Sequence, residues 1–306
     1  MAEALVATGK HTVTALTRPD SASAIPAGVK SVTVDYTDKV SLVTALRGQD
    51  ALIITLSVTT PPATHSTLVE AAAAAGVPWI LPNEWGPDST GSVDTTLTQD
   101  VPSFGLQPIQ RAHIASLGVS SYIAVSTGFW YEWSLSMPAG FGFDFTSRTA
   151  TFFDDGKTQM SLSTWPQVGR AIAALFSLPV EKEEGSSASI SDFRNRQIYV
   201  ASFTTSQDEI LDSVLRVTGD KREDWKIEYE TSRERFERGV EALKQGDGLG
   251  FVRMLYARAL FPVPGVTNTE KTHGLSNDAL RLRKEDLDEA TTRAVERVKT
   301  TKPWGT

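Results

Sequence analysis

The chain has 306 residues, 40% of them hydrophobic, which is enough to bury one wide α/β domain or two lobes. A net charge of −7 and a pI near 5.2 show no excess of basic residues that would attract nucleic acid, so we expect no direct nucleic-acid partner. The chain has no cysteine, which excludes disulfides and thiolate chemistry. It also shows neither a secretory signal pattern nor an apolar run that could span a bilayer, so we expect a cytoplasmic protein with no membrane partner.

The first residues have the pattern of a helix end followed by a strand. Residues 2–8 predict the last turns of a helix, and Gly9 stands where a left-handed C-cap belongs. A strand is expected directly after it at 11–16, and Arg18 comes two residues after its end. In a dinucleotide-binding Rossmann unit this order corresponds to the first helix, the second strand and the residue that reads the adenosine ribose. The first strand and its glycine-rich turn are not found, and G-x-G-x-x-G occurs nowhere in the sequence.

Short apolar runs and helical patterns then alternate as far as residue 125. We expect strands at 32–34, 51–56, 77–81 and 121–125, and helices from Thr37 or Asp38 to Gly48, at 64–75 and at about 109–117. Strands and helices that alternate at this spacing predict a parallel sheet with right-handed crossovers. The expected fold class is therefore α/β, with a Rossmann-like parallel sheet that lacks its first strand.

The second half of the chain loses this alternation. An aromatic stretch at 141–153 ends in an Asp-Asp-Gly turn, and later segments predict helices at 165–178, 206–217, 231–243 and 284–298 and a strand at 197–200. We therefore expect a dinucleotide-binding domain at 1–135 and a smaller substrate lobe at 136–306. Within that lobe, we expect 164–201 to pack back on the Rossmann sheet.

Several short segments, in their order and spacing, resemble the NmrA-like or isoflavone-reductase-like atypical short-chain dehydrogenases, particularly the fungal members. The matching segments are Leu16-Thr17-Arg18, Asp35-Tyr36-Thr37-Asp38, Leu81-Pro82-Asn83-Glu84-Trp85-Gly86, Ser126 to Trp133, Asp155-Gly156 and Val168-Gly169-Arg170. The resemblance covers nearly the whole chain. It implies a Rossmann domain that binds NADPH and a C-terminal lobe that closes over a small-molecule substrate.

The resemblance also implies a set of site residues. Arg18 would grip the 2′-phosphate of NADPH, although a solvated arginine at a strand end is the alternative. Trp85 would line the substrate pocket or only cover a sheet edge, and the aromatic cluster that ends at Trp133 suits either an aromatic ligand or a core between the lobes. The full expected set is Arg18, Asp35, Ser57, Thr59, Asn83 and Glu84 for the cofactor, and Trp85, Phe129, Trp130 and Tyr131 for the substrate.

One position departs from the family pattern. The family's catalytic lysine would fall at Leu106 or Gln107, but no lysine occurs between Lys39 and Lys157. Neither leucine nor glutamine can replace an ammonium as a proton donor. The Tyr-x-x-x-Lys pair of ordinary short-chain dehydrogenases is also absent.

Two functions remain open from these residues. The first is an NADPH-dependent oxidoreductase acting on a small, aromatic or secondary-metabolite substrate. The second is a dinucleotide-sensing regulator or inactive homologue that transfers no hydride. The four histidines are scattered and no nucleophile elbow or P-loop is present, so we expect no metal site and no other catalytic class.

A last expectation concerns the sheet. Without a first strand, the strands at 11–16 and 51–56 would each keep an edge of unpaired backbone groups, which lowers stability. The alternative is that these two strands pair directly and narrow the sheet.

Overall fold

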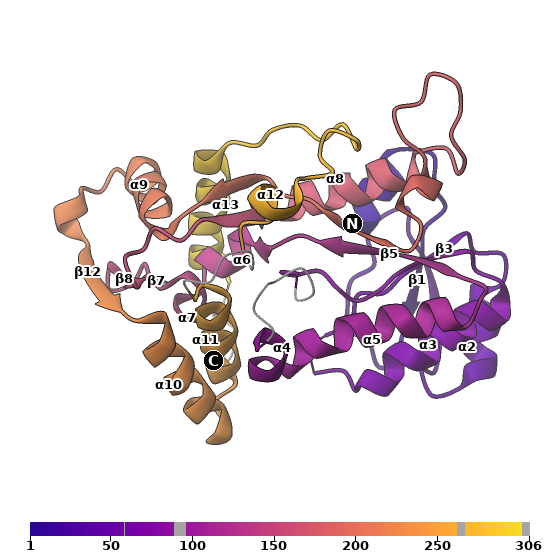
Figure 1. Ribbon diagram of the computed structural model, residues 1–306, viewed down its shortest axis with the longest axis horizontal. Coiled ribbons are helices and arrows are strands. Elements are labelled where there is room, and N and C mark those ends of the chain that lie inside the picture. Colours follow the sequence, from indigo (N-terminus) through magenta and orange to yellow (C-terminus); the bar gives the residue numbers. More distant parts are fainter. Residues whose placement is uncertain (58, 89–95, 262–266, 302–306) are drawn as a thin grey trace.

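The computed structural model describes residues 1–57, 59–88, 96–261 and 267–301. The molecule is elongated, with a first lobe that contains strands β1 to β5 and a second lobe built around β7, β8 and β12 (Figure 1). Both lobes mix helices and strands, and the expected α/β fold with a parallel sheet is confirmed.

The centre of the first lobe is a four-stranded parallel sheet in the order β10-β5-β4-β3. Its strands are β3 (Ala51–Ile53), β4 (Trp79–Leu81), β5 (Ser121–Ser126) and β10 (Arg196–Tyr199). In the register, Ile80 lies opposite both Leu52 and Tyr122. The central strands β4 and β5 are largely buried because helices cover both faces, whereas β3 and β10 at the sides of this sheet are partly exposed.

Alternate residues of β4 face the two helical layers. Trp79 and Leu81 pack with Leu5 and with the apolar side of α8 (Trp165–Phe176), whereas Ile80 packs with the helices on the other face. Figure 1 shows α8 on one side of the sheet and α3 and α5 on the other. The helices of this lobe are α1 (Ala2–Ala7), α2 (Lys39–Leu46), α3 (Pro62–Ala75), α4 (Leu97–Asp100) and α5 (Pro102–Ser116), and α8 joins them from later in the chain.

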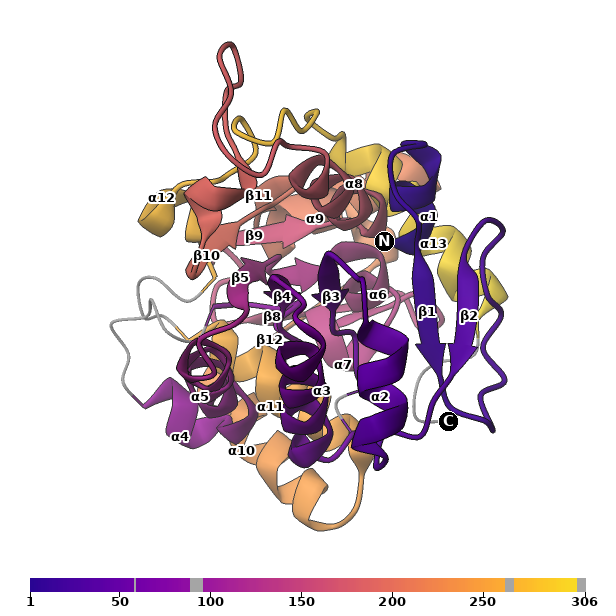
Figure 2. The same cartoon turned by 90° about the vertical axis from the view of Figure 1, so that its right-hand side faces the viewer.

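Strands β1 (Thr14–Thr17) and β2 (Lys30–Thr33) form a separate two-stranded parallel ribbon. Every residue of β2 is exposed. The ribbon stands apart from β3 in Figure 2, and β1 pairs with no strand other than β2 in the described parts of the chain. The alternative that the strands at 11–16 and 51–56 pair directly is therefore wrong.

A cleft of about 1160 Å³ occupies the space between β1 and β3. Its lining contains the unbroken runs 10–16 and 50–56, so β3 borders it along its whole length and β1 along all but its last residue. Leu5 of α1 and Phe176 of α8 line it as well, together with Leu46 and Leu68 of the opposite helical layer.

The second lobe combines two small sheets with several helices. One sheet has the order β11-β9-β6, and the other has the order β12-β8-β7. The strands are β6 (Phe129–Trp130), β7 (Phe143–Asp144), β8 (Thr149–Phe153), β9 (Met160–Ser163), β11 (Phe203–Thr205) and β12 (Lys226–Glu230). The helices are α6 (Tyr131–Leu135), α7 (Pro138–Phe141), α9 (Gln207–Thr218), α10 (Ser232–Lys244), α11 (Gly248–Ala259), α12 (Thr269–His273) and α13 (Leu287–Thr300). Short 3₁₀ turns occur at Ile190–Phe193 and Arg222–Asp224.

Side-chain caps fix where most of these helices begin. Asp38, Thr164, Ser206 and Thr231 each accept a hydrogen bond from a backbone N–H in the first turn of the helix that follows. One predicted helix start is wrong, because α5 begins at Pro102 and not near Ile109. Pro108 lies inside the helix.

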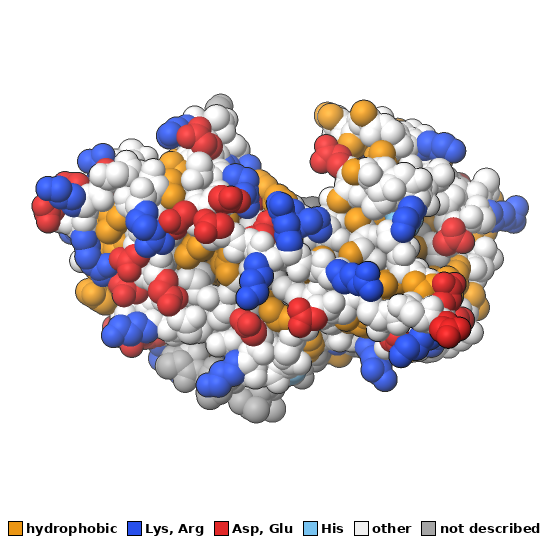
Figure 3. Space-filling view, turned by 90° about the horizontal axis from the view of Figure 1, so that it is seen from above, with side chains coloured by type: hydrophobic (Ala, Val, Ile, Leu, Met, Phe, Trp, Pro, Cys, Tyr) orange, Lys and Arg blue, Asp and Glu red, His pale blue; other side chains and the backbone are white. Residues whose placement is uncertain are grey.

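The surface carries both signs of charge. On the face shown in Figure 3, basic and acidic side chains are interspersed, and no large patch has a single sign. Among the helices that the structure describes, none is long and apolar enough to cross a membrane.

Candidate active site at the carboxyl edge of the sheet

The ends of β3 and β4 are clamped together by Asn83. Its Oδ1 accepts a hydrogen bond from the Leu56 N–H at 3.0 Å, and its Nδ2 donates to the Leu56 carbonyl at 3.1 Å. The neighbouring Trp85 donates from Nε1 to the carbonyl of Ile54 at 2.7 Å. Asn83, expected to bind the cofactor, therefore uses its amide to hold the edge together at the place where α/β folds bind ligands.

Glu84 points away from this edge toward α5. Its side chain is 4% exposed and lies against Arg111, whose Nε is 3.0 Å from Oε1 and whose Nη2 is 2.6 Å from Oε2. Burial raises the pKa of Glu84, although Arg111 opposes the rise. Burial would lower the pKa of Arg111, but the Glu84 carboxylate outweighs it and the pKa is raised. The two opposite charges balance each other, and the ion pair fixes α5 to the end of β4.

The end of β5 is joined to the same edge. Trp130 donates from Nε1 to the carbonyl of Trp85 at 2.8 Å and to Thr127 Oγ1 at 3.0 Å. Ser126 Oγ donates to the carbonyl of Gly86 at 3.1 Å. Because Trp85 and Trp130 are only partly buried, both indole rings remain available as apolar walls beside the sheet edge.

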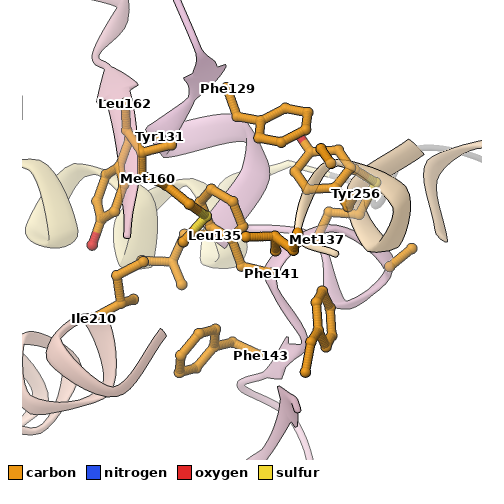
Figure 4. Packing of buried hydrophobic residues seen from close by; sticks show 14 of the residues in the cluster. Phe129, Tyr131, Leu135, Met137, Phe141, Phe143, Met160, Leu162, Ile210 and Tyr256 are labelled. Atoms are coloured by element: carbon orange, nitrogen blue, oxygen red, sulfur yellow. The ribbon is translucent and has the colours of Figure 1, made fainter. Parts of the chain in front are cut away.

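Phe129 and Tyr131 lie in the core of the second lobe. Phe129 is 5% exposed and stacks on Tyr256 with ring centroids 4.0 Å apart (Figure 4). Tyr131 is fully buried, and its hydroxyl is 2.7 Å from Thr291 Oγ1. Both were expected to bind substrate, and in this structure they pack mainly within the core of the second lobe. Trp133 packs against the same core.

The ends of β1 and β2 hold the two remaining charged candidates. The Arg18 side chain is 64% exposed, and its Nε is 3.8 Å from Asp20. Asp35 is also exposed and accepts hydrogen bonds from the N–H and hydroxyl of Thr37, which lower its pKa. The ribbon therefore presents an open guanidinium at its carboxyl end.

The loop after β3 carries the two hydroxyl candidates. Ser57 Oγ is 2.9 Å from Thr59 Oγ1 and accepts a hydrogen bond from the Thr59 N–H at 3.3 Å. Both residues are exposed, and they stabilise a turn between β3 and α3.

Leu106 and Gln107 lie in the second turn of α5. Leu106 is partly buried, and Gln107 is 8% exposed. Arg111 follows Gln107 by one helical turn, so its bonds to Glu84 hold this part of α5 against the sheet. The two positions at which the family's lysine would fall therefore carry an apolar side chain and an amide.

Sequence reasoning missed a second group of polar residues near this edge. Asp88, which is 1% exposed, accepts a hydrogen bond from the Tyr199 hydroxyl at 2.9 Å. The Tyr199 ring stacks on His273 at 4.4 Å between centroids. The position of Asp88 after a strand end was the one available signal, since Tyr199 and His273 lie more than 100 residues further along the chain. In the described ranges, no cluster of three His, Asp or Glu residues is placed to hold a metal ion.

The described residues fit part of a dinucleotide. Arg18 offers an exposed fork that suits a phosphate, and the clamped edge of β3 to β5 offers apolar walls and hydroxyl groups for a nicotinamide ring. In the described ranges, no glycine-rich turn stands before a helix where a pyrophosphate would bind.

Comparison with known proteins agrees with this geometry. Residues 1–84 match a family described as NAD(P)H-binding. The resemblance to the NmrA-like and isoflavone-reductase-like family is confirmed. The chain is 25% identical over 248 residues to the oxidoreductase poxI of Penicillium oxalicum, covering 80% of this chain and 74% of that protein.

The fold is shared with solved reductases. The crystal structure of isoflavone reductase superimposes with a TM-score of 0.70 and 16% identity, covering 95% of this chain and 94% of that chain. The NADPH-dependent quinone oxidoreductase QOR2 of Escherichia coli, complexed with NADPH, gives a TM-score of 0.64 and 16% identity over 96% and 94% of the two chains. At this level of identity the likeness concerns the fold.

Proposed function

We propose that this isoflavone-reductase-like protein is an NADPH-dependent oxidoreductase that reduces a small aromatic or secondary-metabolite substrate at the carboxyl edge of β3 to β5. The placement of Arg18 carries the proposal, because its guanidinium is 64% exposed at the end of β1, within the part of the chain that matches the NAD(P)H-binding family. A guanidinium fork suits a 2′-phosphate.

Each part of the edge has a role in this proposal. Bound NADPH would supply the hydride. Arg18 and Asp35 would hold the adenosine end, and Ser57 and Thr59 would lie near the nicotinamide. Asn83 and the Glu84–Arg111 pair would act as positioning residues, since their polar atoms bind the protein itself. Trp85 and Trp130 would form the substrate wall.

Cofactor titration by calorimetry tests this assignment. Arg18→Ala should weaken NADPH binding by about tenfold or more, because a hydrogen bond to a charged group contributes roughly 1.5–3 kcal/mol. Binding of NADH should stay nearly unchanged. Arg47→Ala is the matched control. Arg47 is an exposed arginine at the C-terminal end of α2, at the amino edge of the sheet, whereas Arg18 lies at the carboxyl end of β1. Equal losses for both cofactors would show that Arg18 is structural, and a wild type that binds neither would refute the proposed function.

A second candidate function is a dinucleotide-sensing regulator that transfers no hydride. The observation that favours it is that Leu106 and Gln107, the two positions at which the catalytic lysine is expected, carry no ammonium group. Arg111 cannot take over as the acid, because it is bound to Glu84 and does not release a proton near neutral pH.

Single-turnover oxidation of NADPH with a quinone acceptor distinguishes the two candidates. We expect slow oxidation by the wild type and an increase of roughly tenfold or more in Gln107→Lys, since general acids typically contribute 10²–10⁴-fold. Ala112→Lys adds the same charge to the exposed side of α5 and should change nothing. A fast wild type that the new lysine does not improve would place the acid elsewhere.

A further inference from the structure

A hollow of about 360 Å³ lies between the first turn of α8 and the C-terminal half of α13. Trp165 of α8 borders it on one side, and Arg293 and Arg297 of α13 border it on the other. The remaining lining residues are Thr292, Glu296, Thr300 and Thr301. The volume lies within the roughly 300–1,000 Å³ of small-molecule sites, so the hollow has room for a ligand with an organic body.

The charge of Arg293 is compensated by a buried carboxylate. Glu132 of α6 is 2% exposed, and it accepts hydrogen bonds from the Trp165 N–H at 3.1 Å and from Arg293 Nε at 3.0 Å. These two bonds join α13 to the first turn of α8. The Nη2 group of Arg293 is enclosed and has no acceptor in the parts of the chain that the structure describes. Arg293 therefore keeps hydrogen-bonding capacity beyond the carboxylate that balances its charge.

The charge of Arg297 has no such partner. Its guanidinium carbon lies 4.8 Å from the centre of the Trp165 ring, and no group in the described ranges accepts a hydrogen bond from it. Its Nε is enclosed, whereas its two Nη groups open on the hollow. Arg293 and Arg297 are one helical turn apart, where like charges destabilise a helix. An anion between them would relieve this repulsion and supply the missing acceptors.

The neighbouring charges favour a ligand with a single negative charge. Lys299 pairs with Glu296 at 2.8 Å. Because Arg293 pairs with Glu132, Arg297 alone is left uncompensated among the charged residues that line the hollow in the described chain. The C-terminal half of α13 also brings the negative end of the helix dipole to this region, which opposes a dianion such as a phosphate monoester.

The rest of the lining favours an aromatic body over further polar groups. The Thr292 hydroxyl donates to the Asp288 carbonyl at 2.8 Å. The Thr300 hydroxyl donates to the Glu296 carbonyl at 3.0 Å, so both hydroxyls are satisfied within α13. Trp165 is 36% exposed, which leaves part of its indole open to a ligand. The arginines are therefore the main donors of the hollow, and the indole is its main apolar surface.

We propose that the hollow between α8 and α13 binds a small aromatic monocarboxylate. Its carboxylate lies between Arg293 and Arg297, and its ring packs against the open part of Trp165. A planar carboxylate matches the guanidinium fork, and its one negative charge matches the one uncompensated arginine. The hollow shares no residue with the proposed active site, so this inference does not depend on the proposed oxidoreductase activity.

The test uses the full chain with benzoate as the probe, and NMR follows the Nε–H signals of Arg293 and Arg297. Benzoate should shift both signals. Arg297→Gln should weaken benzoate binding by about tenfold or more, because hydrogen bonds between charged groups are the strong ones. Lys299→Gln is the matched control, since Lys299 carries the same charge on α13 but is 63% exposed and does not line the hollow. Its affinity should stay within about twofold of the wild type.

Benzamide has the shape of benzoate without its charge, and acetate has the carboxylate without the ring. Both should bind at least about tenfold more weakly than benzoate. Equal binding of benzamide, equal losses in the two variants, or no shift of either signal at about 10 mM benzoate would each overturn the proposal. So would tighter binding of phenyl phosphate, or displacement of benzoate by NADPH, since the hollow would then hold a phosphate group.

Discussion

Glu285 joins α8 and the residue before β11 to its own segment through hydrogen bonds at one carboxylate. It accepts from Ser202 Oγ at 2.5 Å and from Arg170 Nη2 at 2.5 Å, and Thr164, the N-cap of α8, also donates to it. Burial alone would raise the pKa of Glu285, but these hydrogen bonds outweigh burial and lower it from its ordinary value of 4.5. The carboxylate therefore stabilises the fold in its charged form.

The pH dependence of this contribution follows from the lowered pKa. The unfolded chain takes up a proton at Glu285 at higher pH than the folded chain does, so the stabilisation is complete above pH 4.5 and is lost as the pH falls through the folded pKa. We expect Glu285→Gln to lower the free energy of unfolding by about 1–3 kcal/mol at neutral pH. Urea titrations should show this difference shrinking below pH 4.5.

Glu289→Gln is the control for that measurement, because Glu289 is exposed in the first turn of α13. Its unfolding free energy should stay within about 0.5 kcal/mol of the wild type at both pH values. A loss in Glu285→Gln that is the same at neutral and acidic pH would show that the charge plays no part.

For single side chains, the sequence predicted where polar residues follow strand ends but not which groups they would bind. Asn83, Glu84, Trp85 and Trp130 were expected to bind cofactor or substrate, and they lie after the ends of β4 and β5. Their partners could not be predicted, since Asn83 binds Leu56 and Glu84 binds Arg111, each 27 residues away. Whether a polar side chain faces a ligand or the protein depends on such long-range neighbours.

Among the elements, α10 and α11 cross at two glycines. A Cβ on Gly239 would lie 2.5 Å from the Met254 nitrogen and 2.9 Å from the Gly250 carbonyl oxygen. Both of these atoms are backbone, so the helices would have to move apart. Gly105 of α5 is different, because its nearest neighbours would be Thr98 atoms at 3.6 and 3.7 Å, which is ordinary contact.

We therefore expect opposite effects from one substitution at two helical glycines. Gly239→Ala should lower the free energy of unfolding, because overpacking typically costs about 1–3 kcal/mol and exceeds the gain in helix propensity. Gly105→Ala should raise it by about 0.5–1 kcal/mol. Urea denaturation measures both, and stabilisation by both substitutions would contradict the close crossing of α10 and α11.

Element prediction succeeded where local patterns decide the structure. The strand and helix alternation of the first 125 residues produced the parallel sheet, and caps such as Thr164 and Ser206 marked helix starts correctly. Helix α11 was missed, because its glycines and its apolar residues around the whole helix give no amphipathic pattern. The start of α5 was also predicted too late, since the helix begins at Pro102 and contains Pro108.

For the whole molecule, the decisive feature is the division between the β1–β2 ribbon and the four-stranded sheet. The sequence predicted two unpaired strand edges, and the cleft between β1 and β3 has them. Direct pairing of the two strands would have removed the cleft, but β1 and β3 remain separate. That outcome depends on how helices on both faces are positioned, which short sequence patterns do not specify.

Native-state hydrogen exchange should show this division as a difference in protection. Two-stranded ribbons are marginally stable, so the paired amides of Ala15 and Val32 should exchange about 100-fold faster than those of Leu81 and Ile123. Equal protection across both sheets would contradict this view. A sharp two-state thermal transition above about 55 °C, a typical mesophile value, would also contradict it.

The clamp at the carboxyl edge has an optical consequence. The indole of Trp85 is fixed by the Ile54 carbonyl, and that of Trp130 is fixed by the Trp85 carbonyl. Two fluorophores thus stand at fixed orientations beside the proposed cofactor position, and tryptophan emission overlaps the absorption of reduced nicotinamide. Excitation energy should pass from these indoles to bound NADPH but not to the oxidised form. Tryptophan fluorescence should therefore report, without an added label, whether the cofactor is bound and whether it is reduced.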